Sequence, residues 1–145
     1  MMQQIYPTPP HSYTYELHKD FHFAAAHYVP STEAGVCQYT HGHTYFVDVA
    51  VAGNELNQQG FLVNFKIIKD LIHKRFDHTV LNDDEIFSDT DPNGFPTSEV
   101  VARKVYEMIQ DYLNTCENKP VCLQVFLRET PTSYCVYRPR KAGEC

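Results

Sequence analysis

Residues 37–43 read Cys37-Gln38-Tyr39-Thr40-His41-Gly42-His43 and open the clearest strand pattern in the chain. Apolar or aromatic side chains then recur at every second position from Tyr45 to Val51. Side chains two positions apart on a strand lie on the same face, so His41 and His43 should project together. Two neighbouring imidazoles on a strand form half of a zinc site, although packed or surface histidines are the commoner outcome.

A third metal ligand is available upstream of this pair. Residues 21–27 indicate the end of a first strand, and His27 lies where that strand enters a loop. His27, His41 and His43 would leave one coordination position open for water or substrate, which is typical of catalytic zinc. His22 is the competing candidate, but on an extended strand it has the opposite parity to His27.

The composition limits the class of protein. A chain of 145 residues with 43% hydrophobic and 21% charged residues indicates one globular domain. A formal net charge of -6 disfavours a nucleic-acid-binding surface. We find no apolar run long enough to span a membrane and no signal-peptide pattern. The five cysteines then indicate reduced thiols in the cytoplasm; they are Cys37, Cys116, Cys122, Cys135 and Cys145.

The order of elements predicts an α+β fold. We expect strands over residues 13–23, 41–52, 121–127 and 134–137, a helix over 65–76 capped by Asn64, and a second helix opened by Pro96-Thr97-Ser98-Glu99 and ending near Leu113. Short connections favour a four-stranded antiparallel sheet with both helices on one face. Residues 1–12, which contain three prolines, are expected to form a loosely held N-terminal arm before a single domain of residues 13–145.

Five motifs occur in order along the chain, and together they are far more specific than any one of them. They are Phe-x-Ala-Ala-His at 23–27, Cys-x-x-x-His-Gly-His at 37–43, Phe-Asp-His at 76–78, Pro-Thr-Ser-Glu at 96–99 and Arg-Glu-Thr-Pro at 128–131. The set resembles the 6-pyruvoyltetrahydropterin synthase superfamily over residues 15–137. The three residues between the cysteine and the first histidine of the pair are similar to its bacterial 6-carboxy-5,6,7,8-tetrahydropterin synthase branch.

This resemblance implies a fold, an assembly and a reaction. Members have the tunnelling fold (T-fold), in which the sheets of neighbouring subunits join into a barrel and trimers stack as homohexamers. Such a barrel would also cover the two open edges of a four-stranded sheet. The implied reaction is a zinc-dependent lyase step in queuosine biosynthesis. It converts 7,8-dihydroneopterin triphosphate to 6-carboxytetrahydropterin, acetaldehyde and triphosphate.

The resemblance also assigns roles to individual residues. It implies that His27, His41 and His43 bind zinc, that Cys37 is the catalytic cysteine, and that Asp77 and His78 complete the proton-transfer group. Glu129 would anchor the pterin ring, and Thr97 and Ser98 would line the same pocket.

Each assigned residue also has a plain structural explanation. Cys37 would otherwise be an inert buried thiol, His78 a helix-end histidine, and Glu129 an exposed strand-end charge. Two other functions stay open for the whole chain. One is the pyruvoyl-forming synthase, which eliminates triphosphate without breaking a carbon–carbon bond. The other is a zinc-stabilised pterin-binding protein without turnover.

Overall fold

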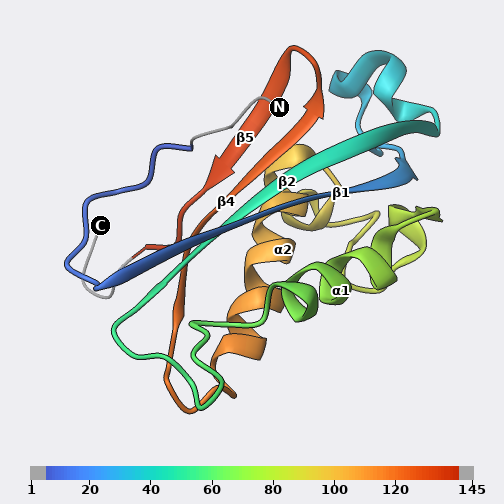
Figure 1. Ribbon diagram of the computed structural model, residues 1–145. Coiled ribbons are helices and arrows are strands. Elements are labelled where there is room, and N and C mark those ends of the chain that lie inside the picture. Colours follow the sequence, from blue (N-terminus) through green and yellow to red (C-terminus); the bar gives the residue numbers. More distant parts are fainter. Residues whose placement is uncertain (1–5, 141–145) are drawn as a thin grey trace.

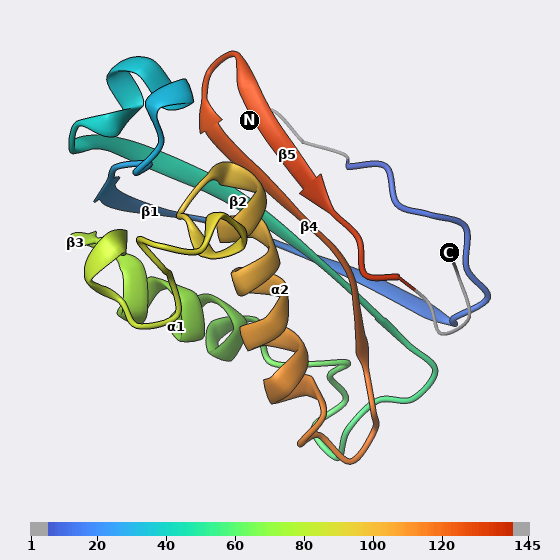
Figure 2. The ribbon, with the colours of Figure 1, turned by 180° about the vertical axis from the view of Figure 1, so that it is seen from behind.

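The computed structural model describes residues 6–140, and a single sheet with both long helices on one face forms its framework (Figures 1 and 2). The strand order is β3-β1-β2-β4-β5. The strands are β1 (Tyr15–His27), β2 (His41–Gly53), β3 (Thr79–Val80), β4 (Val121–Thr130) and β5 (Ser133–Tyr137). The helices are α1 (Phe65–Phe76) and α2 (Ser98–Leu113), and short 3₁₀ helices are η1 (Thr32–Gln38), η2 (Leu81–Asp83) and η3 (Pro92–Gly94).

The α+β class is confirmed, but the sheet differs from the expected one in a way that matters for the site. The neighbours β1, β2, β4 and β5 pair antiparallel as predicted. A fifth strand, β3, adds two residues parallel to β1, so the sheet is mixed. Such a short strand has no detectable sequence period. Its pairing depends on Asp77 and His78, which bond to the backbone of Ala24 and bring β3 alongside β1.

Alternation alone predicted the ends of two strands too early, although residues 21–27 indicated a first strand that reaches His27. β1 ends at His27 rather than Phe23, and β4 ends at Thr130 rather than Leu127. The loop that follows β1 contains the helix η1. The strands extend because backbone pairing continues past the last large apolar residue, and alternation alone cannot detect that pairing.

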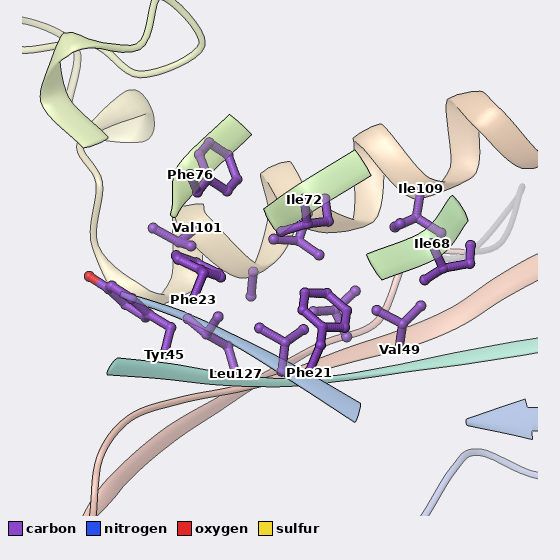
Figure 3. Close-up of a cluster of buried hydrophobic side chains, with 14 of the residues drawn as sticks. Phe21, Phe23, Tyr45, Val49, Ile68, Ile72, Phe76, Val101, Ile109 and Leu127 are labelled. Atoms are coloured by element: carbon purple, nitrogen blue, oxygen red, sulfur yellow. The ribbon is translucent and has the colours of Figure 1, made fainter. Parts of the chain in front are cut away.

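The core lies between the sheet and the helices (Figure 3). Each helix contributes a stripe with four-residue spacing, as predicted: Ile68, Ile72 and Phe76 from α1, and Val101, Val105 and Ile109 from α2. These side chains are at most 1% exposed. They pack on the inward-facing residues of the central strands, including Phe21, Phe23, Val49 and Leu127. Burial of each such side chain stabilises the fold by about 1.5–3 kcal/mol.

Both helices begin at the expected caps. The Asn64 side chain accepts a hydrogen bond from Lys66 N at 2.9 Å, and the Thr97 hydroxyl accepts one from Val100 N at 3.3 Å. These bonds satisfy backbone donors that a helix start leaves without intrahelical partners. No helix within residues 6–140 has the length and apolar character needed to cross a membrane.

The N-terminal arm is attached to the sheet over its described part, residues 6–12. Gln124 Nε2 donates to the Pro7 carbonyl at 2.9 Å, and the Thr8 hydroxyl donates to Glu16 at 2.8 Å. The Tyr6 ring lies 4.8 Å from that of Phe126. Over these residues the arm thus contacts strands that lie far away in the sequence. Residues 1–5 lie outside the described part.

Candidate active site

Strand register brings the three histidines together. His27 is the direct cross-strand partner of His41, and Ala25 is the partner of His43. His41 and His43 lie two positions apart on β2, so all three imidazoles project from one face, at one end of the sheet. Each offers a ligand atom within 4.8 Å of the others. His22 lies on the opposite face, where its ring packs 5.8 Å from that of Phe46, as its parity predicted.

Backbone carbonyls orient two of the imidazoles. His27 Nδ1 donates to the Pro96 carbonyl at 2.7 Å, and His41 Nδ1 donates to the Tyr39 carbonyl at 2.7 Å. These bonds leave the Nε2 atoms of both rings as acceptors, and the two Nε2 atoms lie 3.1 Å apart. Metal-ligating histidines usually donate their second ring nitrogen to such an oxygen.

The donor set therefore suits a transition-metal ion with an open coordination position. Burial lowers the pKa of His43, and the neighbouring His27 and His41 lower it further. A lowered pKa keeps the imidazole neutral, which is the form that binds a metal. Within residues 6–140, this cluster is the only group of histidines, cysteines and acids with metal-binding geometry, and it does not include Cys37.

Glu129 lies against these imidazoles. Its Oε1 atom is 3.1 Å from His27 Nε2 and 3.4 Å from His43 Nε2, while Oε2 accepts a hydrogen bond from the Ser98 hydroxyl at 2.8 Å. When His27 carries a proton on Nε2 as well, its bond with Oε1, followed by the bond from Ser98, lowers the pKa of Glu129 to about 2. The structure thus unites Glu129 and Ser98 with the histidine cluster. Thr97, the residue before Ser98, uses its hydroxyl to cap α2.

Asp77 and His78 form a second group beside β1. Asp77 Oδ2 lies 3.3 Å from His78 Nε2, and Oδ1 accepts the Ala24 N–H at 2.9 Å. The bond from Ala24 and the neighbouring histidines lower the pKa of Asp77. His78 has a φ of 60°, in the left-handed region that non-glycine residues seldom adopt, and its side chain is 85% exposed.

A shallow cavity connects the two groups. Its volume is about 460 Å³, and both His43 and His78 line it, together with residues 24–26, Gly42, Thr44 and Thr79. A larger cavity of about 760 Å³ lies elsewhere, between residues 55–67 and the end of α2, and contains none of the expected site residues. The smaller cavity is the relevant one, because it is lined both by a histidine of the cluster and by His78.

The backbone of Cys37 lies beside the segment that follows β1. It lies near the end of η1, half-buried and not in a disulfide, and its carbonyl accepts the Val29 N–H at 2.7 Å. Val29 follows His27 by two residues, so this bond returns the loop to the end of β1. The other cysteines within residues 6–140 also form no disulfide.

Sequence reasoning missed several supporting groups. The Pro96 and Tyr39 carbonyls accept hydrogen bonds from imidazoles. Every residue has a backbone carbonyl, so the residue types gave no indication of these two contacts. His73 lies 3.4 Å from Asp77, and its four-residue spacing on a helix could have indicated this contact. Tyr45 packs beside His27 and His43, and its buried hydroxyl has no hydrogen-bond partner within residues 6–140.

Comparisons with known proteins agree with this arrangement. The model of the family described as 6-pyruvoyl tetrahydropterin synthase matches residues 16–140. A Bacillus subtilis protein named 6-carboxy-5,6,7,8-tetrahydropterin synthase is 57% identical over 143 residues, which cover 99% of this chain and 98% of that protein. A Synechocystis protein of the same name is 30% identical over 66% of this chain and 74% of its own. The structure of Caenorhabditis elegans 6-pyruvoyl tetrahydropterin synthase matches with a TM-score of 0.69 at 26% identity, covering 87% of this chain and 96% of that one.

Proposed function

Because the chain belongs to the 6-pyruvoyl tetrahydropterin synthase family, we propose that it is a zinc-dependent 6-carboxy-5,6,7,8-tetrahydropterin synthase. The proposed reaction converts 7,8-dihydroneopterin triphosphate and water to 6-carboxytetrahydropterin, acetaldehyde and triphosphate, within queuosine biosynthesis. The observation that carries the proposal is the near full-length similarity to the Bacillus subtilis protein of that name. We expect the enzyme to act in the cytoplasm as a homohexamer with its sheets joined into a barrel.

The histidine cluster supports the metal part of the proposal. His27, His41 and His43 would hold the ion through their Nε2 atoms, with the Pro96 and Tyr39 carbonyls keeping the first two rings oriented. A bound zinc ion would supply Lewis acidity toward the hydroxyl oxygens of the substrate side chain.

The remaining residues would bind the substrate and move protons. Glu129 would accept two hydrogen bonds from the pterin edge, and Ser98 would hold the carboxylate in position. Cys37 would act as a thiolate base on the substrate side chain. His78, paired with Asp77 and sharing a cavity with His43, would give or take the second proton. Thr97 would keep the α2 start, and hence Ser98, in place.

The product distinguishes the proposal from its alternatives. The purified protein, loaded with zinc and given dihydroneopterin triphosphate, should release acetaldehyde and triphosphate in equal amounts. Triphosphate without acetaldehyde would indicate the pyruvoyl-forming reaction. Binding of the pterin without release of either product would indicate a binding protein and refute the enzymatic proposal.

A further inference from the structure

Asp77 has a second histidine partner that the five motifs do not include. His73 lies one turn earlier on α1, and residues four apart on a helix share a face. His73 Nε2 is 3.4 Å from Asp77 Oδ2, the oxygen that also lies 3.3 Å from His78 Nε2. The other oxygen, Oδ1, accepts the Ala24 N–H. The carboxylate is therefore contacted from α1, from β1 and from His78.

The two histidines differ in how firmly they are held. The His73 side chain is 35% exposed and belongs to the last turns of a regular helix, where few rotamers are allowed. The His78 side chain is 85% exposed and follows the helix end. Of the two partners, His73 is thus the one with a restricted position, and His78 is the one free to meet a substrate.

We propose that His73 is a positioning residue, which holds Asp77 in the orientation in which the carboxylate supports His78. This inference rests on the proposed function, in which Asp77 and His78 form the proton-transfer pair. Without His73, the only ion-pair partner of Asp77 Oδ2 within residues 6–140 is the exposed His78 ring, so this oxygen loses its restraint from α1. With His73 present, Asp77 Oδ1 is bound to β1 and Oδ2 is restrained by α1. His78 then contacts a carboxylate whose orientation is fixed.

The charges around Asp77 are consistent with this role. The titratable groups that face it are His22 from β1, His73 from α1, and His78. A plainer explanation is that His73 only stabilises the carboxyl end of α1, where Lys74 and Arg75 also lie. Lys74 separates the two explanations, because it lies in the same turn but pairs with Asp70, at 3.9 Å.

Three variants of the zinc-loaded protein test the proposal: His73→Leu, His73→Gln and Lys74→Gln. Leucine removes the donor, whereas glutamine keeps an N–H that can reach the carboxylate. We expect His73→Leu to lower kcat by about threefold to tenfold, a small part of the roughly hundredfold or more that a positioned acid–base group contributes. KM and zinc content should stay at the parent values. His73→Gln should recover most of the lost kcat, and Lys74→Gln should match the parent.

Hydrogen exchange at the Ala24 amide gives a measurement that does not depend on activity. This amide donates to the Asp77 side chain, so its protection reports how firmly the carboxylate is held. We expect exchange about threefold faster in His73→Leu and unchanged in Lys74→Gln. Parent-like kcat and exchange in His73→Leu, or an equal loss in Lys74→Gln, would overturn the proposal. If the parent releases no acetaldehyde, the proposed function fails, but the exchange rates still decide the role of His73.

Discussion

Replacing Glu129 by glutamine changes one charged acceptor at the point where the proposed pterin site meets the histidine cluster. In the parent, Oε2 accepts from the Ser98 hydroxyl at 2.8 Å and Oε1 lies 3.1 Å from His27 Nε2. A glutamine has nearly the same shape and keeps one acceptor oxygen, which Ser98 can still use. Its amide nitrogen, however, presents donors where the pterin edge also presents a donor.

The expected loss of pterin affinity follows from the number of charge-assisted hydrogen bonds that the substitution removes. A hydrogen bond to a charged group contributes about 1.5–3 kcal/mol. The variant keeps the Ser98 bond and loses one of the two charge-assisted bonds to the pterin, so affinity should fall roughly tenfold to over a hundredfold. Ser98→Ala removes only the supporting bond and should weaken binding by less than about tenfold. Glu99→Gln makes the same chemical change at an exposed position of α2 and should have no effect.

Calorimetric titration of a pterin into the four proteins, with zinc measured in each, tests this reasoning. We expect weaker pterin binding by Glu129→Gln with zinc at the parent level. Equal affinities would show that Glu129 does not hold the ring. A parallel loss of zinc would show instead that Glu129, which touches His27 and His43, belongs to the metal-binding set.

Four further outcomes are expected. His41→Ala should lose most of its zinc while circular dichroism shows a retained fold; full metal occupancy would remove this histidine from the ligand set. Cys37→Ala should keep zinc and pterin binding but release no acetaldehyde, and loss of its metal would make Cys37 a ligand instead. In metal-free protein, the pKa of Glu129 is lowered from 4.5 to about 2. This shift predicts that the ionised carboxylate stabilises the fold by about 1–2 kcal/mol after discounting for solvent screening. The stabilisation should be present above pH 4.5 and lost as the pH falls toward 2. Urea unfolding should show this acid-dependent loss in the parent and not in Glu129→Gln. Sedimentation at micromolar concentration should give a hexamer, and a monomer would contradict the barrel.

Local sequence patterns were sufficient for much of the framework. The alternation from His43 to Val51 predicted a strand with His41 and His43 on one face, and parity excluded His22 from the histidine cluster. The four-residue spacing of Ile68, Ile72 and Phe76 predicted α1 with its correct bounds. These predictions succeeded because strand parity, helix periodicity and capping each depend on residues only a few positions apart.

Only the tertiary structure determined how distant segments meet. His27 faces His41 because the register of β1 on β2 places them opposite each other, and its ring is oriented by Pro96, 69 residues away. Ser98 reaches Glu129 across 31 residues, and Asp77 reaches Ala24 across 53. The parallel strand β3 and the attachment of residues 6–12 also depend on such pairings. A sequence period identifies the face of a helix or strand on which a side chain lies. The packing of the whole chain decides which other element that face contacts.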